Sequence, residues 1–80
     1  MYYVYVLKSI NFDRRYVGFT TNIEKRLAQH NSGKTHSTKA YKPWKLIYSE
    51  EIEAKEQALK REKFFKSGRG RAFLKEKLGL

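Results

Sequence analysis

The sequence predicts a small α/β domain, in which a three-stranded antiparallel sheet is flanked by helices in the order β-β-α-β-α-α. Short segments rich in valine and tyrosine, with side chains suited to a pleated surface, indicate strands. Longer segments with apolar residues at helical spacing follow the second and third of these strands. A chain of 80 residues builds one modest core, so residues 1–80 are interpreted as a single domain.

The first two strands are expected to form a hairpin. Residues 2–8 and 15–20 are rich in β-branched and aromatic side chains, and the polar turn "INFDRR" lies between them. A helix-start signal follows, because Thr21 and Glu24 have the spacing of a capping box, in which Thr21 accepts from free N–H groups and Glu24 reaches back. We therefore expect a helix over residues 22–32.

The second half of the chain predicts one more strand and two helices. Residues 33–43 are polar and basic and indicate a loop, and residues 44–51 have the composition of a strand. A long helical pattern covers residues 53–67. The tripeptide "GRG" at 68–70 predicts a break, after which a short final helix is expected over residues 71–80.

Charge is the most pronounced feature of the composition. Eighteen Lys and Arg residues against eight Asp and Glu give a formal charge of +10. Such a surplus predicts a polyanionic partner, most often nucleic acid. A solubility device or an anionic membrane surface is the alternative, but an aromatic content of 15%, interleaved with the basic residues, favours nucleic acid.

Composition also excludes several classes of site. The chain has no cysteine, which rules out disulfides, thiolate zinc sites and cysteine nucleophiles. No apolar run is long enough to span a bilayer, and the N-terminal residues do not have the pattern of a signal peptide. We therefore expect a cytoplasmic protein without membrane association.

One carboxylate on the long predicted helix faces the core side. At about 100° per residue, Ala54, Ala58, Leu59 and Phe65 share a face, and Glu62 projects from its middle. A carboxylate in that position costs free energy unless it is paired or binds a metal. The pattern leaves both interpretations open: an ion pair with a neighbouring Lys or Arg, or a metal site.

The first helix and the hairpin carry a second group of candidates. Arg26 and His30 are one helical turn apart and suit phosphate binding, although a solvent-exposed basic face gives the same spacing. Tyr3 and Tyr5 share one face of the first strand, and Tyr16 is expected across the hairpin. Aromatic packing between strands explains the tyrosines as well as chemistry does.

Together, these residues resemble the GIY-YIG nuclease family. The two motifs that name the family appear as "YVY" at residues 3–5 and "YVG" at residues 16–18. The family's arginine and histidine match Arg26 and His30 within "EKRLAQHN", and its glutamate matches Glu62 within "ALKREKFF". The resemblance covers essentially the whole chain and is closest to short stand-alone bacterial members, relatives of repair and structure-specific endonuclease domains of the UvrC and Slx type.

The resemblance implies a metal-dependent endonuclease that hydrolyses DNA phosphodiester bonds, directed by structure or strand breaks and with little sequence specificity. One divalent cation, Mg²⁺ or Mn²⁺, would be held by Glu62 and polarise the scissile phosphate. Arg26 would neutralise charge on the phosphoryl oxygens. Either Tyr5 or Tyr16 would help to deprotonate the attacking water, and His30 would assist by hydrogen bonding or proton transfer.

Further contacts with nucleic acid are expected around these catalytic candidates. A glycine in the second motif lets the backbone approach its neighbours closely, a loop histidine could reach the phosphate, and the basic tail surrounds a flexible glycine hinge. The expected nucleic-acid-binding residues are Gly18, His36, Lys39, Lys66, Arg69 and Arg71. Tyr3 stands where the family has glycine, which bears on the shape of substrate that fits.

The chief alternative is a non-catalytic nucleic-acid-binding module on the same fold, because small basic domains with aromatic strands bind single strands by stacking. The presence of Glu62 argues against it, since binding a polyanion gains nothing from a carboxylate. A basic protein-interaction or ribosome-associated domain is a third interpretation. The expected partner is DNA, with RNA also open; the expected state is a monomer, and a partner protein could supply specificity.

Overall fold

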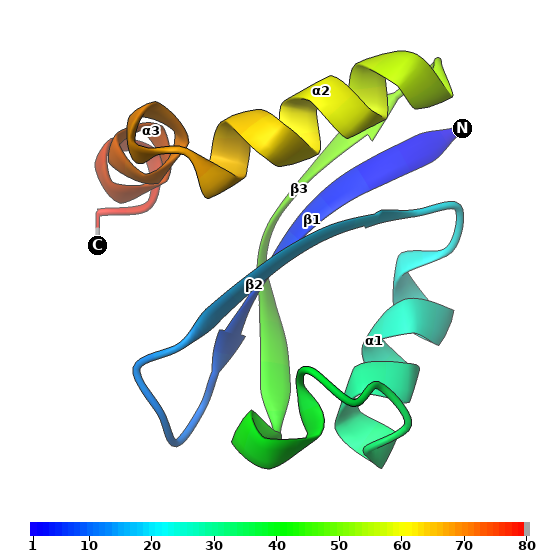
Figure 1. Ribbon diagram of the computed structural model, residues 1–80, viewed down its shortest axis with the longest axis vertical. Coiled ribbons are helices and arrows are strands. Elements are labelled where there is room, and N and C mark those ends of the chain that lie inside the picture. The colour runs from blue at the N-terminus through cyan, green and yellow to red at the C-terminus, as the bar shows by residue number, and fades with distance from the viewer. Residues whose placement is uncertain (80) are drawn as a thin grey trace.

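The fold is seen in a computed structural model that describes residues 1–79. The elements are β1 (Tyr2–Ser9), β2 (Arg15–Thr20), α1 (Ile23–Ser32), the short 3-10 helix η1 (Lys39–Tyr41), β3 (Trp44–Ile52), α2 (Lys55–Lys66) and α3 (Gly68–Leu78) (Figure 1). This order confirms the predicted β-β-α-β-α-α arrangement and adds η1 inside the predicted loop. Leu80, the last residue of the predicted final helix, lies outside the described residues.

The sheet has the strand order β2-β1-β3, and both neighbours run antiparallel to the central strand β1. The predicted hairpin is therefore confirmed. Its register pairs Tyr5 with Gly18 and Leu7 with Tyr16. The ladder between β1 and β3 shifts register between Val6 and Leu7.

Helices cover both faces of the sheet, with α2 and α3 on one side and α1 on the other (Figure 1). Side chains alternate along a strand, so β1 contributes to two cores. Val4 and Val6 pack with Phe65 and other residues of α2 and α3. Tyr5 and Leu7 pack with Trp44 and with residues of α1. The tyrosines of the hairpin therefore belong to the face that α1 covers.

The helix α1 begins one residue later than a capping box at Thr21 requires, so that prediction is wrong. Asn22 is the N-cap, with extended backbone (φ −148°, ψ 100°), and its Oδ1 accepts a hydrogen bond from the Lys25 N–H at 3.1 Å. The Thr20 hydroxyl accepts from the Asn22 N–H at 3.1 Å and so fixes the turn into the helix. Glu24 lies in the first helical turn, where a negative charge complements the helix dipole.

The predicted break at "GRG" is also displaced, because α3 already begins at Gly68. The chain turns at Ser67, which ends α2 and whose hydroxyl caps α3 by accepting from the Gly70 N–H at 3.3 Å. Gly70 is buried, and a Cβ there would collide with the Phe64 carbonyl oxygen and lie 2.5 Å from the Phe65 Cα. The glycine therefore allows close packing of α3 on the end of α2 and is no flexible hinge.

Arg61 joins α2 to β3. Its Nε and one terminal nitrogen donate to the two carboxylate oxygens of Glu50 at 2.8 and 3.0 Å, and its guanidinium lies 4.6 to 5.1 Å from the ring centroids of three phenylalanines, Phe64, Phe65 and Phe73. Tyr48 donates to the same carboxylate at 2.6 Å. The hydrogen bond from Arg61 lowers the pKa of Glu50, whereas burial and the Glu50 carboxylate raise the pKa of Tyr48 to about 12.

The face of α2 that meets the sheet is narrower than predicted. Ala58 and Phe65 are buried as expected, but Leu59 is 41% exposed and Ala54 precedes the helix as its N-cap. Leu59 is rotated by about 100° from Ala58 around the helix axis, which places it outside the narrow buried stripe. Within residues 1–79, every helix is too short or too polar to cross a membrane.

Candidate active site

Four of the predicted catalytic side chains form a cluster on the sheet face that α1 covers. Tyr5 comes from β1, Tyr16 from β2, and Arg26 and His30 from successive turns of α1. The ring centroids of Tyr5 and Tyr16 are 6.2 Å apart, and those of Tyr16 and His30 are 4.8 Å apart. The hairpin supplies two phenols, and one helix face supplies a guanidinium and an imidazole.

His30 lies inside this cluster with no exposed surface. Its Nε2 is 3.0 Å from the Tyr5 hydroxyl oxygen, and its Nδ1 is 2.8 Å from the Thr38 hydroxyl oxygen. The Thr38 hydroxyl donates to the Thr35 carbonyl oxygen at 3.4 Å, so it accepts from Nδ1–H, and Nε2 accepts from the Tyr5 O–H. A solvent-exposed basic face shared with Arg26 is therefore the wrong interpretation for His30.

The protonation state of His30 follows from its surroundings. Burial and the positive charge of Arg26 both lower the pKa of His30 below its ordinary value of 6.5, so the imidazole is neutral at pH 7. A neutral ring, with one N–H and one lone pair, matches both hydrogen bonds. His30 can receive a proton from Tyr5, but it has no surface with which to touch a substrate.

Tyr5 is itself only 1% exposed, and its hydroxyl lies over Gly18 of the neighbouring strand. A Cβ at Gly18 would be 2.7 Å from the Tyr5 hydroxyl oxygen and 3.1 Å from Cε2 of Tyr16. Gly18 is buried, so the structure gives it a packing role in place of the predicted contact with nucleic acid. Burial raises the pKa of Tyr5, the hydrogen bond from Arg26 opposes this, and the charge of Glu62 adds a smaller increase.

Arg26 lies above the Tyr5 hydroxyl and is half-buried. Its Nε donates to Tyr5 at 3.4 Å, and one terminal nitrogen donates to the Gln29 side-chain oxygen at 3.1 Å. The hydrogen bond with Tyr5 raises the pKa of Arg26, which is charged at any pH of interest. An arginine has five N–H donors, so donors remain for an anionic ligand while the guanidinium is held in one orientation.

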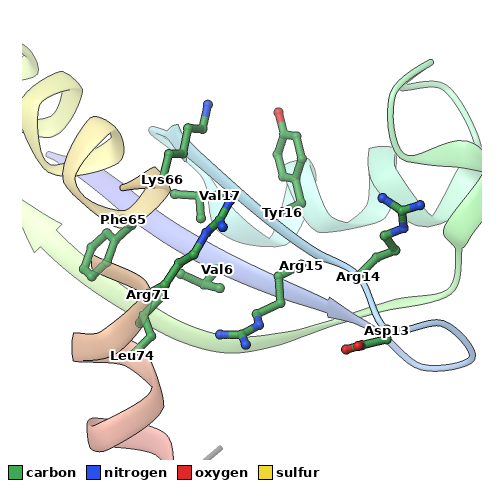
Figure 2. Close-up of a pocket in the computed structure, with 10 residues that line it drawn as sticks. All are labelled: Val6, Asp13, Arg14, Arg15, Tyr16, Val17, Phe65, Lys66, Arg71 and Leu74. Atoms are coloured by element: carbon green, nitrogen blue, oxygen red, sulfur yellow. The ribbon is translucent and has the colours of Figure 1, made fainter. Parts of the chain in front are cut away.

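Tyr16 differs from Tyr5 in that it is half-buried and lines a groove of about 470 Å³. Figure 2 shows the groove, whose side chains come from β1, from β2 and the turn before it, and from the corner between α2 and α3. Its floor is apolar, with Val6 and Val17 from the sheet. Tyr16 is the phenol of the pair that an outside ligand can approach.

The rim of this groove is strongly cationic. Arg14, Arg15, Lys66 and Arg71 line it, and Asp13 is its one acidic residue. We expect Lys66 and Arg71 to bind nucleic acid, and both line the groove. Figure 2 shows the Tyr16 ring and the Arg15 side chain on opposite sides of β2, so the groove lies along the edge of the sheet. A concave surface with four cations and one anion attracts phosphate groups.

Glu62 is held by α2, on the other side of the sheet from α1. It lies in line with the buried residues Ala58 and Phe65, and its side chain is 19% exposed. The ion-pair alternative is found, because Lys66 Nζ lies 3.5 Å from Glu62 Oε2. Lys66 is 56% exposed, so the pair contributes little free energy and leaves the carboxylate available. The charge of Glu62 is the weakest of the influences on the pKa of Tyr5, and within residues 1–79 no hydrogen bond or ion pair joins Glu62 to the tyrosine cluster.

The donor set around Glu62 restricts which metal ion suits this site. Residues 1–79 contain no group of three His, Asp or Glu side chains arranged to hold a metal. Zinc, which needs three or four protein ligands, does not fit such a site. Mg²⁺ fits, because it keeps several waters and takes one or two carboxylates together with phosphate oxygens of the substrate.

Three other predicted contacts lie away from the groove. His36 is exposed in the loop before η1, Lys39 is exposed on η1, and Arg69 is exposed on α3. None of the three is among the residues that line the groove in the described part of the chain. They are cations on the surface, and the structure brings none of them to the tyrosine cluster.

Two contributors to the site were missed by sequence reasoning. Thr38 fixes the tautomer of His30. It lies eight residues after His30 in a polar loop, where nothing in the sequence pattern indicates a contact with the histidine. Arg15 lines the groove and adjoins Tyr16 in β2. Strand alternation could have indicated that Arg15 and Tyr16 point to opposite faces of the sheet.

Comparisons with known proteins agree with this geometry. The family model described as the GIY-YIG catalytic domain matches residues 1–76. A UPF0213 protein of Staphylococcus haemolyticus is 42% identical over 62 residues, covering 76% of this chain and 74% of that protein. A UPF0213 protein of Streptococcus pneumoniae is 45% identical over 65 residues, covering 80% of this chain and 65% of that protein.

A solved structure shares the fold as well as the sequence. The solution NMR structure of the UPF0213 protein BH0048 from Bacillus halodurans aligns with a TM-score of 0.54 at 32% identity, covering 91% of this chain and 80% of that one. The shared fold therefore extends over most of the chain. By its sequence motifs, its fold and its matched residues, this chain belongs to the GIY-YIG family.

Proposed function

We propose that this protein is a divalent-metal-dependent endonuclease that hydrolyses DNA phosphodiester bonds. The observation that carries the proposal is the hydrogen-bond chain in which Arg26 donates to Tyr5, Tyr5 to His30, and His30 to Thr38. The network stabilises the fold, and it also holds a phenol and a guanidinium in fixed positions, as a catalytic site requires.

The two phenols have different roles in this proposal. Tyr16 is half-buried and lines the open groove, which supports it as the tyrosine that binds the attacking water and helps to deprotonate it. Tyr5 is 1% exposed and already hydrogen bonded, which supports a positioning role under Arg26. Arg26 donates its remaining N–H groups to the phosphoryl oxygens, where negative charge increases in the transition state.

Glu62 is the residue that would hold the divalent cation. When bound there with its waters, Mg²⁺ or Mn²⁺ would polarise the scissile phosphate and stabilise the leaving oxygen. Hydrolysis forms a bond from the water oxygen to phosphorus and breaks the bond from phosphorus to one strand. The weak pairing of Glu62 with Lys66 supports this role, because binding a cation replaces a partner of small energetic value.

The proposed substrate is DNA with a nick, flap or branch, recognised with little regard to sequence. The cations around the groove would contact phosphates, and phosphate contacts position a strand without reading its bases. RNA carries the same phosphate charge, so RNA is tested as a substrate beside DNA.

The test is a cleavage panel on nicked, flapped, branched and uninterrupted duplex DNA, with Mg²⁺, Mn²⁺ or a chelator, and with RNA of the same sequences. We expect metal-dependent cleavage that Glu62→Gln abolishes. Glu56→Gln, on an exposed position of the same helix, is the matched control and should cleave like the parent. If Glu62→Gln retains cleavage and metal dependence, the proposed catalytic role is wrong.

A different outcome would favour the binding module. If neither the parent nor Glu62→Gln cleaves any substrate, yet both bind with an affinity that falls steeply as salt rises, the protein holds nucleic acid without cutting it. Because Glu62→Gln removes a negative charge near the groove, it should then bind DNA at least as tightly as the parent.

A further inference from the structure

Three cations stand side by side across the sheet at the end nearest the hairpin turn. In the register of the sheet, Lys8 of β1 is paired with Arg15 of β2 on one side and with Lys45 of β3 on the other. Paired residues point to the same face. Strand alternation from Val6 places this row on the face that α2 and α3 cover further along the sheet.

The row is unfavourable for folding. Like charges directly opposite each other in a sheet are destabilising, and Lys8 has such a neighbour on both sides. Neither of the two ion pairs within residues 1–79 involves Lys8, Arg15 or Lys45. In the described part of the chain, the Lys8 ammonium has one hydrogen bond, to the Ser9 carbonyl oxygen at 3.5 Å. Departures from local stability rules of this kind are concentrated at functional sites.

The row continues the cationic groove. Arg15 belongs to both, since it lines the groove together with Lys66 and Arg71. Strands lie about 4.8 Å apart, so three cations in register extend over roughly 10 Å. A row of three unpaired cations over that length presents positive charge to successive phosphates of one nucleic-acid strand, whose backbone contacts are electrostatic and independent of sequence.

The row and the catalytic cluster lie on opposite faces of the sheet. Arg15 and Tyr16 are adjacent in β2, so their side chains point to opposite sides, and β2 is an edge strand. A single polynucleotide strand that contacts both must turn around the edge of β2, a path that passes through the groove. Duplex DNA, with a persistence length of about 150 base pairs, does not make such a turn, whereas a single strand does.

We propose that Arg15, Lys8 and Lys45 form a second backbone-binding site, which takes the flexible single strand of a flapped or nicked DNA as it leaves the scissile phosphate. This inference rests on the proposed endonuclease function for its ligand. It adds a reason for the choice of substrate: a strand must be free to bend around β2 before both sites are filled.

The experiment measures the fluorescence anisotropy of labelled flapped DNA and blunt duplex DNA over a range of NaCl concentrations. Lys8→Gln is compared with Lys55→Gln, which removes the same charge at the distant start of α2. For flapped DNA, we expect Lys8→Gln to weaken binding about fivefold or more and to reduce the slope of log K against log salt by about 0.7. Binding of blunt duplex should change no more than it does with Lys55→Gln.

Melting temperatures distinguish the loss of a cation from this row from the loss of a cation elsewhere on the surface. Because Lys8→Gln removes two like-charge neighbours, its melting temperature should rise by about 2 °C or more, while that of Lys55→Gln stays unchanged. Lys45→Gln, which removes one such neighbour, should show smaller changes in the same directions. The proposal is overturned if Lys8→Gln and Lys55→Gln behave alike, or if flap and blunt duplex lose affinity equally.

Cleavage distinguishes failure of this site from failure of the proposed function. With saturating flapped DNA and metal, Lys8→Gln should keep the kcat of the parent while its KM rises, because the row touches no reacting atom. If no variant or parent cleaves DNA but Lys8→Gln still selectively weakens flap binding, the endonuclease proposal fails and the second site stands.

Discussion

The Tyr5 hydroxyl oxygen lies 3.0 Å from Nε2 of His30, and the other ring nitrogen of His30 lies 2.8 Å from the Thr38 hydroxyl. His30 therefore has its two partners inside the protein and no surface outside it. His30 therefore acts on the site through its hydrogen bond with Tyr5, which also accepts from Arg26, and through the packing of its ring against Tyr16.

Removal of the Tyr5 hydroxyl and removal of the Tyr16 hydroxyl are expected to affect stability differently. Tyr5→Phe leaves His30 Nε2 buried without its donor, so we expect a loss of about 1–3 kcal/mol of unfolding free energy together with reduced cleavage. Tyr16→Phe removes a half-buried hydroxyl and leaves the hydrogen bonds of Tyr5 and His30 in place, so cleavage should fall while stability stays within about 0.5 kcal/mol of the parent. Urea denaturation and single-turnover cleavage measure the two quantities. Equal stability losses in both variants would contradict the distinction.

The buried imidazole predicts a pH dependence of stability. The pKa of His30 is lowered in the folded state, so below pH 6.5 the unfolded chain binds a proton that the folded chain does not. The contribution of neutral His30 to the free energy of unfolding is therefore complete above about pH 6.5. It is lost as the pH falls toward the pKa of His30 in the folded state. We expect the melting temperature to decrease over that interval. His30→Gln should flatten this decrease, whereas His36→Gln, at an exposed position, should leave it unchanged.

Gly18 and Gly68 give a matched pair of substitutions. A Cβ at Gly18 would lie 2.7 Å from the hydroxyl oxygen of Tyr5, which is buried and unable to move aside. Gly18→Ala should destabilise by about 1–3 kcal/mol and lower cleavage roughly 10- to 100-fold by displacing the phenol. Gly68, at the start of α3, has no atom within 4 Å of such a Cβ. Gly68→Ala should therefore be neutral or stabilising by up to about 1 kcal/mol, as thermal denaturation would measure.

The Arg61 cluster predicts a change in stability without a change in chemistry. Arg61→Lys keeps the charge but loses the two-pronged hydrogen bond to Glu50 and the planar contact with Phe64 and Phe65. We expect a loss of about 1–2 kcal/mol in urea denaturation. The kcat for flapped DNA should remain that of the parent, because Arg61 lies outside the groove and the tyrosine cluster. A fall in kcat with unchanged stability would assign Arg61 to catalysis instead.

The sequence was sufficient to predict the strands because their alternation is local. The first helix start was misplaced by one residue, since Asn22 and Thr21 are both good caps and only the turn fixed by Thr20 decides between them. The residues "GRG" are a breaker pattern in isolation, yet Gly70 is in α3 because close packing on α2 requires a glycine. These errors arise where tertiary contacts override a local preference.

The candidate site was predictable in identity but not in arrangement. Motif spacing points to Tyr5, Arg26 and His30, but the burial of His30 depends on Thr38, which a polar loop brings back onto α1. The row of Arg15, Lys8 and Lys45 depends on sheet register, including the shift between Val6 and Leu7. Neither relationship is encoded by neighbours along the chain.

Because β2 is an edge strand, its outer backbone groups have no partner strand within the sheet. A second molecule that extended the sheet there would close the route past Tyr16, and the cations Arg14 and Arg15 beside this edge disfavour such pairing between equally charged chains. Self-association that preserved the substrate path would have to use the opposite margin of the sheet, along β3.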